Sequence, residues 1–421
     1  MQANFLTLKN NYIHSGKGSD KEFCLLANGF WQAEGYIGGI FRSGINFYPI
    51  CTATQLFSDQ SVKFFLRLNN ALSNKGTFNI TLNKENKFVI HYRLSGWNTF
   101  LSIFVPYFYM LYGAKYIAIH KLKKIYELKN LIKQNSDPYL KVLLITLAYS
   151  LTGQCSRYKL SLKEKLISLN LDSVLLNVLP KLSYSENNIS TCFLFILGLF
   201  LGDGTLHLKL LWKKKNNTIA IVPLFNIVQS NTESNKEIME KLAKIFNNLN
   251  IKSNLIKSTK TFVLSVKGID NVFNSLFPLL VKYSHFLYWK SDSFNLLVWV
   301  KLLIENGGHH TYLGLNALID KIYATTNKRF IKKEVWETRL KDWLNTLSYG
   351  RNCGEYYISH IYTLNKQVRG WQVRFPSTLK LNNFNRAFMS STYGGSDKAF
   401  VLAVQYRDKI ISDWIKKIYS I

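Results

Sequence analysis

The chain has 421 residues, of which 47% are hydrophobic and 14% aromatic, enough for two or three packed domains and too many for a disordered protein. Lys and Arg outnumber Asp and Glu by 54 to 25, a formal charge of +29. This charge favours a polyanionic partner, nucleic acid first and an anionic membrane surface second. No apolar run reaches the roughly 18–20 residues of a membrane span, and the five scattered cysteines indicate neither a disulfide framework nor a zinc site.

The first part of the chain alternates helical and strand patterns. A helix, a pair of strands, a second helix, a hairpin and a third helix are predicted in that order. The predicted ranges are 23–33, 36–41, 45–54, 59–72, 77–93 and 115–133. Residues 136–190 that follow are mostly helical in pattern and form a connector.

The same order of elements returns after the connector. The apolar run Phe193–Gly202, ended by Gly204, predicts a buried helix, and Ser234 with Glu237 forms a capping box that opens a second one. The strands predicted around them and the last helix cover 205–212, 218–229, 251–257, 261–266 and 291–304. Each copy therefore reads α-β-β-α-β-β-α, an α+β unit with a four-stranded sheet.

Three landmarks indicate that the second unit is a duplicate of the first. Gly29–Gly35 is echoed by Gly198–Gly204 at an offset of 169 residues. Gly96 is echoed by Gly268, and Pro106 by Pro278, both at an offset of 172. Three landmarks in the same order are the signature of an internal repeat.

A segment of different rhythm ends the chain. Residues 332–347 predict a charged helix, and three short strands and a helix follow it. These elements cover 356–362, 370–375, 385–390 and 396–419.

The repeated helices carry the residues that matter for chemistry. Gly29 and Ala33 in the first copy, and Gly198 and Gly202 in the second, are small residues four apart, so two such helices can approach closely. Their ends would then bring Glu34 and Asp203 together, and two carboxylates at helix C-termini repel each other unless cations lie between them. Taken singly, each segment is also typical of a packed helix with a glycine cap. An acid before glycine in both copies favours metal ligands.

The two segments, Ala27–Gly35 and Ile196–Gly204, resemble the LAGLIDADG motif of homing endonucleases and group I intron maturases. The first departs from the pattern at Asn28, Trp31 and Gln32. The resemblance covers about residues 20–330. It implies a pseudo-symmetric DNA-binding saddle, Mg²⁺ held by Glu34 and Asp203, and a staggered cut of double-stranded DNA. The resulting domains are two half-domains at 1–135 and 191–331, the connector at 136–190, and a C-terminal module at 332–421.

Further site residues follow from that resemblance. Gln55 and Gln229 end the second strand of each copy, where relatives place a polar side chain that orders water, although a solvated strand end explains them equally well. Lys282 is the candidate for a basic residue at the scissile phosphate. Nucleic-acid contacts are expected along the strands and their turns, each one also readable as a solvated surface residue. These candidates are Arg42, Asn46, His207, Lys209, Lys213, Lys214, Lys215, Lys252, Lys257 and Lys260.

The stretches Gly370–Phe375 and Tyr393–Ala399 resemble an AP2-type DNA-binding domain, which is a three-stranded sheet on one helix. Strand alternation puts Gln372 and Arg374 on one face and the aromatic residues on the other. We expect the polar face to meet DNA, and a plain structural tail is the alternative.

These observations favour a monomeric, metal-dependent site-specific DNA endonuclease. The alternative is a non-catalytic RNA-binding derivative of the same fold, such as an intron maturase or an RNA-assembly component that binds a group I intron or rRNA. The A+T-rich codon usage implied by frequent Lys, Asn, Ile, Phe and Tyr, and an N-terminus without a targeting pattern, predict a protein encoded and used in an organelle, most simply the mitochondrion.

Overall fold

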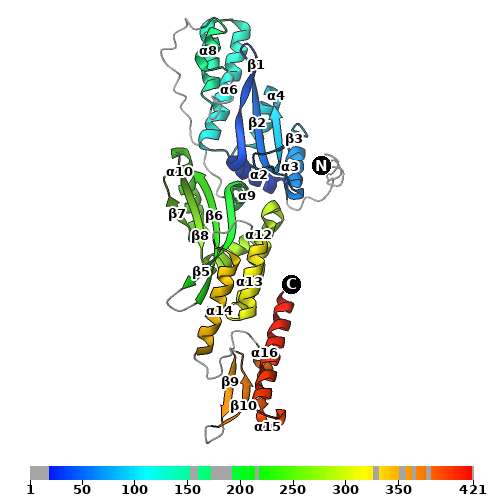
Figure 1. Ribbon diagram of the computed structural model, residues 1–421. Helices are drawn as coiled ribbons and strands as arrows, with labels where there is room; N and C mark the ends of the chain where they lie inside the picture. The colour runs from blue at the N-terminus through cyan, green and yellow to red at the C-terminus, as the bar shows by residue number, and fades with distance from the viewer. Residues whose placement is uncertain are drawn as a thin grey trace. The chain divides into compact units, whose positions relative to one another are not determined.

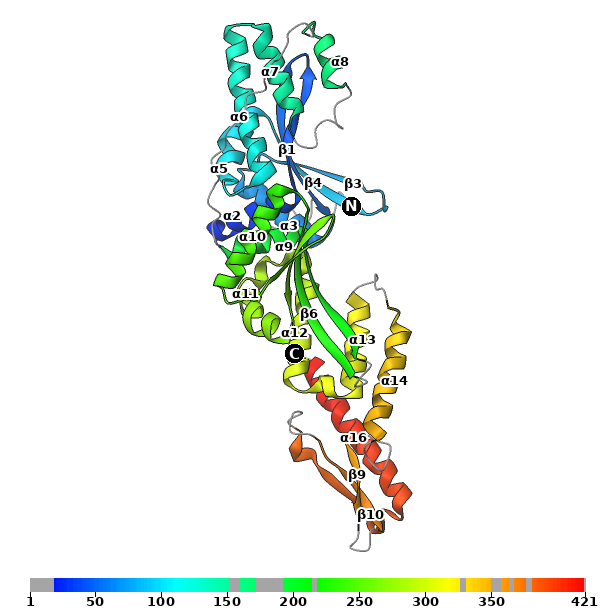
Figure 2. The ribbon, with the colours of Figure 1, turned by 90° about the vertical axis from the view of Figure 1, so that its left-hand side faces the viewer.

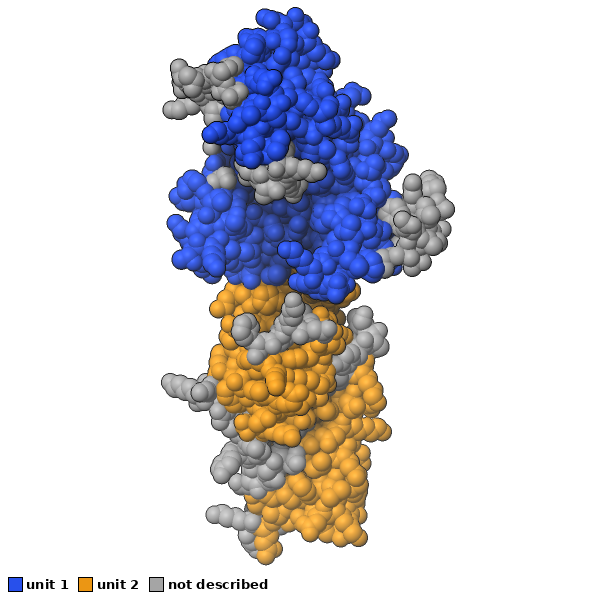
Figure 3. All heavy atoms as spheres, turned by 45° about the horizontal axis from the view of Figure 1, so that its top comes forward, with its two compact units in different colours: residues 1–205, 225–266, 275–290 blue, residues 206–224, 267–274, 291–421 orange. Residues whose placement is uncertain are grey.

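The computed structural model describes residues 19–151, 160–171, 192–213, 218–325, 331–349, 357–362, 367–375 and 381–419 (Figure 1). The chain divides into two compact units, coloured separately in Figure 3. The first unit comprises residues 1–205, 225–266 and 275–290, and the second comprises 206–224, 267–274 and 291–421. Within the described residues, no helix combines the length and the apolar character needed to cross a bilayer.

The first half has the predicted order of elements. Its helices begin at caps that the sequence supplies: Ser19 and Glu22 form a capping box at the start of α2, and Ser58 with Ser61 forms one at the start of α3. A π-helical turn and two short helices separate the sheet from the long helix α6. The elements are α2 (Asp20–Glu34), β1 (Gly35–Ser43), β2 (Asn46–Leu56), α3 (Asp59–Ala71), β3 (Thr77–Leu82), β4 (Phe88–Ser95), α4 (Trp97–Thr99), η1 (Phe100–Phe104), α5 (Val105–Tyr107) and α6 (Gly113–Gln134).

The four strands of the first half form an antiparallel sheet in the order β1-β2-β4-β3. Strand alternation gives it one buried and one open face. Ala53, opposite Tyr92 on β4, belongs to the buried face and both residues are almost fully enclosed. Thr54, opposite His91, belongs to the open face. The two faces of the sheet therefore have the contrast that the sequence predicts.

The described part of the connector contributes two helices, and its residues 152–159 and 172–190 lie outside the described residues. The second half repeats the first, with the strand order β5-β6-β8-β7 (Figure 1), and Figure 2 shows its long strand β6 from another side. Its elements, after α7 (Pro138–Tyr149) and α8 (Leu162–Ile167) of the connector, are α9 (Phe193–Asp203), β5 (Gly204–Lys213), β6 (Thr218–Ser230), α10 (Glu233–Asn248), β7 (Asn254–Lys257), β8 (Thr261–Lys267), η4 (Asp270–Leu276), α11 (Phe277–Lys282), η5 (Ser284–Phe286), η6 (Tyr288–Lys290) and α12 (Ser291–Glu305).

A pair of glycine turns confirms the duplication. Gly96 N donates to Pro49 O in the first half, and Gly268 N donates to Pro223 O in the second, both at 3.1 Å. Gly96 and Gly268 have φ angles of +94° and +100°, which disfavour any residue with a Cβ. A π-helical turn and then a proline follow each glycine. The landmarks read from the sequence therefore mark equivalent points of two copies of one unit.

One predicted cap differs from the structure. Helix α10 begins at Glu233, so Ser234 lies inside the helix, and the side chain of Thr232 accepts the hydrogen bond from Asn235 N. Thr and Ser are both good N-caps, and in this structure Thr232 takes the position. The described part of the connector is helical, as predicted.

The C-terminal module has the predicted three-stranded sheet, in the order β11-β10-β9, and one long helix. The ring of Trp371 on β10 packs at a tilt against that of Phe400 of the helix, 4.5 Å between ring centroids, and its Nε1 donates to Ser396 O at 2.9 Å. Tyr312 and Leu313 of the preceding helix also pack against this core. The elements from α13 onward are α13 (Tyr312–Thr325), α14 (Lys333–Tyr349), β9 (Ile358–Tyr362), β10 (Val368–Val373), β11 (Arg386–Met389), α15 (Ser390–Tyr393) and α16 (Ser396–Tyr419).

Candidate active site

Helices α2 and α9 pack side by side through the small residues of the two motifs. A Cβ added to Gly29 would lie 1.9 Å from Phe195 O, and one added to Gly198 would lie 2.0 Å from Leu26 O. One turn further along, a Cβ on Gly202 would lie 2.4 Å from the Cβ of Ala33. The backbones therefore touch at two successive turns, and only small residues fit there.

This packing predicts a large effect for the smallest possible substitution. Gly198→Ala places its methyl group against backbone atoms of α2, which cannot move without shifting the helix. We expect a loss of roughly 1–3 kcal/mol of stability, seen as a lower melting temperature. The control is Gly44→Ala at the tip of the β1–β2 hairpin, where nothing lies within 4 Å and only the positive φ of 51° costs about 1 kcal/mol. Equal melting temperatures for Gly198→Ala and the wild type would contradict the packing.

The packed helices bring the ends of both motifs together. Glu34 is the last residue of α2 and Asp203 the last residue of α9, and both are half-buried. The Cγ of Glu34 lies 2.9 Å from the position that a Cβ of Gly202 would take. The pKa of Glu34 is raised by burial and then by the charge of Asp203, and burial raises the pKa of Asp203 as well. Glu34 therefore lies close enough to Asp203 for the charge of Asp203 to disfavour the ionised form of Glu34.

Each acid is followed directly by a glycine that turns the chain from helix into strand. A Cβ on Gly35 would lie 2.1 Å from the Trp31 ring, and one on Gly204 would lie 2.2 Å from the Phe200 ring. The glycines therefore allow an aromatic residue of the last helical turn to cover the point where the strand begins. Each acid therefore lies at the junction between its helix and the strand that follows.

Gln229 lies beside the pair, as the sequence predicted for a strand end near the site. Its Nε2 donates to Asp203 Oδ2 at 2.6 Å. Gln55, the matching residue of the first half, has its Oε1 turned to the backbone N of Leu56 at 2.8 Å. The two glutamines therefore differ in this structure, and only Gln229 orients an acid.

Two lysines that the sequence analysis did not identify lie at the helix ends that carry the acids. The Nζ of Lys115, in the first turn of α6, donates to the carbonyl oxygens of Trp31, Gln32 and Ala33 at 2.7, 2.6 and 3.1 Å. Burial lowers the pKa of Lys115 to about 7, against the charges of Asp203 and Glu34, which raise it. An ammonium at the C-terminal end of a helix is also favoured by the helix dipole. Lys115 therefore brings a cation to the last turn of α2.

Lys290 has the equivalent position in the second half. Its Nζ donates to Gly204 O at 2.7 Å, and burial lowers its pKa although both acids raise it. The neighbouring Trp289 donates from Nε1 to Leu201 O at 2.9 Å and lies 5.6 Å from the ring of Phe30. Each of the two acids therefore has a lysine at the end of its own helix, Lys115 for Glu34 and Lys290 for Asp203.

The sequence had singled out Lys282 for this role. Lys282 is the exposed last residue of α11, and its Nζ lies 5.1 Å from the ring of Tyr283. The sequence signal that could have identified Lys115 and Lys290 lies in the internal repeat. The offset between copies increases from 169 to 172 residues, and Lys115 and Lys290 continue this drift at 175. Both come directly before or within the start of a long helix.

The donor set fits a hard divalent cation. Glu34 and Asp203 offer carboxylate oxygens, which Mg²⁺ and Ca²⁺ prefer. Their raised pKa values mark a pair that is costly when both are ionised, and a cation between them removes that cost. The described residues contain no group of three or more His, Cys, Asp or Glu that could hold a metal. Further ligands would therefore be water, backbone carbonyls or phosphate oxygens of a bound nucleic acid.

Metal binding predicts a measurable gain in stability. Ca²⁺ at ten times its dissociation constant adds about 1.4 kcal/mol, or roughly 2–4 °C in melting temperature. The double variant Glu34→Gln/Asp203→Asn loses this gain, whereas Glu22→Gln at the opposite end of α2 keeps it. A metal-dependent rise of the same size in the double variant would place the metal elsewhere. Without metal, both carboxyl groups have a higher pKa in the folded protein than in the unfolded chain. The free energy of unfolding therefore falls as the pH rises from the unfolded-state pKa to the folded-state pKa.

The open face of the first sheet is lined by polar side chains. The register aligns Thr52 with Arg93, and Thr54 with His91. His91 is held between two hydroxyl groups, with Nδ1 3.0 Å from Thr54 Oγ1 and Nε2 2.8 Å from Thr81 Oγ1. Such rows match a surface that contacts base edges and phosphates. The sequence pattern did not single out these residues because their cross-strand partners depend on register.

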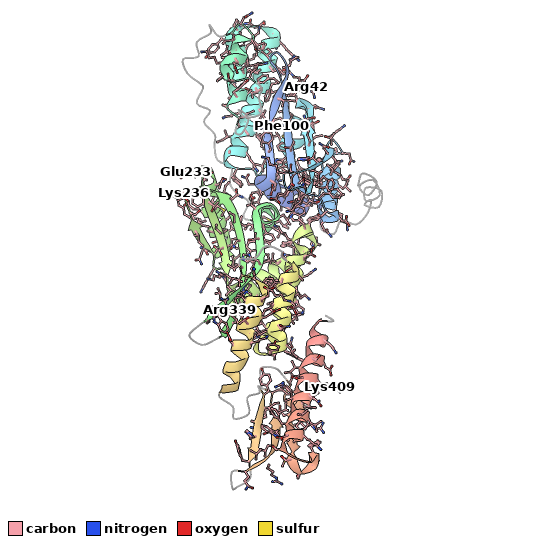
Figure 4. All side chains as sticks on the ribbon, in the orientation of Figure 1. Arg42, Phe100, Glu233, Lys236, Arg339 and Lys409 are labelled. Atoms are coloured by element: carbon pink, nitrogen blue, oxygen red, sulfur yellow. The ribbon has the colours of Figure 1, made fainter. Side chains whose placement is uncertain are left out.

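The predicted contact residues of the first half lie at the hairpin tip. Arg42, labelled in Figure 4, is exposed, and its guanidinium lies 4.2 Å from the ring of Tyr48. Asn46 is exposed at the start of β2, and its Nδ2 donates to Ser43 Oγ at 3.4 Å. These two side chains are therefore accessible at one end of the sheet.

The predicted residues of the second half lie along two hairpins. His207 is half-buried and Lys209 exposed within β5, and Lys213 is exposed at its end. Lys214 and Lys215 lie outside the described residues. Lys252 in the turn before the β7–β8 hairpin, and Lys257 and Lys260 within the hairpin, are also exposed.

Solved structures share this architecture. The homing endonuclease I-SmaMI bound to cleaved DNA has 17% sequence identity and a TM-score of 0.57, with 75% of this chain and all of that chain covered. The fold is that of the LAGLIDADG homing endonucleases. I-CpaMI bound to uncleaved DNA is 18% identical, with a TM-score of 0.57 over 72% of this chain and 99% of its own. I-GzeII in complex with its DNA target is 17% identical, with a TM-score of 0.56 over 71% of this chain and 97% of its own.

The comparisons find the likeness to LAGLIDADG enzymes among solved structures only. No protein-family model matches the chain, and no curated protein sequence matches it. The duplicated α+β unit and its antiparallel sheets agree with the LAGLIDADG fold.

Proposed function

We propose that the protein is a site-specific double-strand DNA endonuclease that depends on a divalent metal, with Mg²⁺ as its physiological ion. The observation that carries this proposal is the pair Glu34 and Asp203 at the ends of two packed helices, with Lys115 and Lys290 beside them. A helix-packing role alone requires the glycines and explains neither the half-buried acids nor the half-buried lysines. The DNA-bound state of the structural neighbours supports the same function.

The residues of the site have separate roles in this proposal. Glu34 and Asp203 hold the divalent ion, which when bound polarises the scissile phosphate and lowers the pKa of water. Gln229 fixes the orientation of Asp203 through its 2.6 Å hydrogen bond. Lys115 and Lys290 place positive charge at the ends of α2 and α9, where it stabilises negative charge that develops on a phosphate.

The test is incubation of the purified full chain with Mg²⁺ and a plasmid library of candidate intronless target sites. We expect linear products with a staggered cut at one sequence, and none when EDTA replaces Mg²⁺. Absence of cutting together with tighter binding to structured RNA than to duplex DNA at matched salt would favour the non-catalytic RNA-binding alternative. Matched salt is necessary because phosphate contacts make both affinities salt-dependent.

We also propose that the open face of the C-terminal sheet contributes to DNA binding, in the manner of an AP2-type module. Trp371 and Val373 are buried toward α16, and Gln372 lies between them in the sequence and on the other face. Arg374 follows the strand and is exposed. An arginine beside an open sheet face can pair with a phosphate.

Arg374→Ala is expected to weaken DNA binding by a few fold and to make the salt dependence shallower by about 0.9 in the log–log slope, the value for one phosphate contact. The control is Arg386→Ala, whose guanidinium lies 5.4 Å from the rings of Phe388 and Tyr406. Titrations at several salt concentrations measure both effects. An unchanged slope for Arg374→Ala would remove this residue from the interface.

A further inference from the structure

Two amide side chains are buried one helical turn apart on α2. Asn28 is fully enclosed and Gln32 is 6% exposed. They depart from the apolar pattern of the motif, and the equivalent residues of α9 are the fully buried Leu197 and Leu201. Burying a side-chain amide is costly unless its hydrogen bonds are made, so the partners of these amides indicate what they do.

Asn28 uses its amide to hold a segment more than 75 residues away in sequence. Its Nδ2 donates to Tyr107 O at 2.9 Å and to Cys24 O of its own helix at 2.9 Å. Its Oδ1 accepts a hydrogen bond from Met110 N at 3.0 Å. Both ends of the amide are satisfied, and the backbone of residues 107–110 is fixed along the helix.

Gln32 continues this contact toward the site. Its Oε1 accepts a hydrogen bond from Tyr112 N at 2.9 Å, and Tyr112 is the residue directly before α6. The carbonyl oxygen of the same Gln32 accepts from Lys115 Nζ at 2.6 Å. One residue of α2 therefore holds both the entry to α6 and the ammonium group in its first turn.

We propose that Asn28 and Gln32 are positioning residues that hold the segment 107–112 against α2 and so keep the Lys115 ammonium at the helix end beside Glu34. Their role in cleavage rests on the proposed function. In the second half Lys290 is placed differently, by its neighbour Trp289, which bonds to Leu201 O and packs on Phe30. Loss of the amides therefore disturbs one half of the site and leaves the other intact.

The first test is strand-resolved cleavage by Gln32→Met. Methionine has nearly the same length and shape, but it removes the acceptor for Tyr112 N. With a duplex labelled on each strand, we expect a rate at least tenfold lower for one strand, an unchanged rate for the other, and an unchanged KM. Gln32→Glu retains an acceptor oxygen and restores the rate. Leu201→Met, the same replacement at the equivalent buried position of α9, is the matched control.

A role limited to general stability gives a different result. It lowers the amount of folded enzyme and slows both strands equally. Equal slowing, or no slowing of either strand in a folded Gln32→Met protein, would overturn the proposal.

The second test, hydrogen exchange, needs no enzymatic activity. The hydrogen bonds predict that the Met110 and Tyr112 amides of the wild-type protein, free of metal and DNA, are protected from hydrogen exchange about as well as the interior of α2. Gln32→Met is expected to raise exchange in peptides covering 107–116, whereas Leu201→Met leaves them unchanged. Exchange of these wild-type amides at the rate of an exposed loop would overturn the proposal even if the enzyme cuts DNA. Protection in a protein that cuts no DNA would refute only the proposed function.

Discussion

Glu34→Gln and Asp203→Asn are each expected to abolish double-strand cleavage, with a fall of roughly 10³-fold in the rate of strand hydrolysis. Both amides keep the size of the acid and remove its charge, so the metal loses a ligand while the packing of α2 on α9 persists. DNA affinity should stay within about tenfold of the wild-type value, or 1.4 kcal/mol, because the acids bind metal and do not contact the bases of the DNA. Single-turnover cleavage of a duplex labelled on both strands measures the rates.

The matched control for the acids is Glu22→Gln. Glu22 belongs to the same helix as Glu34 but caps its opposite end, through a hydrogen bond to Ser19 N. Replacing Glu22 by Gln removes a carboxylate from α2 but changes no residue of the candidate site. Cleavage at the wild-type rate by Glu34→Gln or by Asp203→Asn would remove the catalytic assignment, whereas a change in affinity of more than tenfold would indicate a direct contact with DNA.

Lys115→Met is expected to slow cleavage of one strand by about 10²-fold, and Lys290→Met that of the other. Each substitution removes an ammonium whose pKa is raised by the charges of both acids, while methionine retains most of the apolar stem. Lys282→Met provides the comparison, because Lys282 is exposed at the end of α11 and makes its ring contact with Tyr283. The same strand-resolved assay serves all three variants.

The comparison among the three lysines decides between two interpretations of the sequence. Slower cleavage by Lys282→Met, with normal rates for the other two, would restore the residue that the sequence singled out. If Lys115→Met slowed the cleavage of both strands and Lys290→Met slowed neither, the two halves of the site would share one lysine. Affinity measured in Ca²⁺ separates these effects from lost binding.

Much of the fold could be predicted because its signals are local. The periodicity of apolar residues predicted α2, α9, α16 and the four hairpins, with boundaries mostly within three residues of those observed. The repeat was readable because Gly96 and Gly268 occupy backbone conformations that other residues adopt poorly. The predicted cap of α10 lies two residues beyond the observed one, since Thr232 and Ser234 are both capable of capping and the residue type alone does not distinguish them.

The candidate site was predictable only in part. Glu34 and Asp203 could be predicted because each stands at a fixed place beside the small residues that pack the helices. Gln229 lies where the strand pattern indicated, but its bond to Asp203 depends on the rotamer that the fold imposes. No sequence signal distinguished Gln55, whose side chain bonds to its own neighbour instead.

The sequence by itself determined the duplicated α+β unit, the close approach of two helices and the acids at their ends. Each of these follows from residue size, periodicity or backbone conformation within a short stretch. The tertiary structure decided which lysines reach the acids and why Asn28 and Gln32 are polar. Lys115 is more than 80 residues from the carbonyls that it contacts, so its place depends on how α6 packs against α2. That packing is set by many weak contacts acting together, and no local pattern along the chain records it.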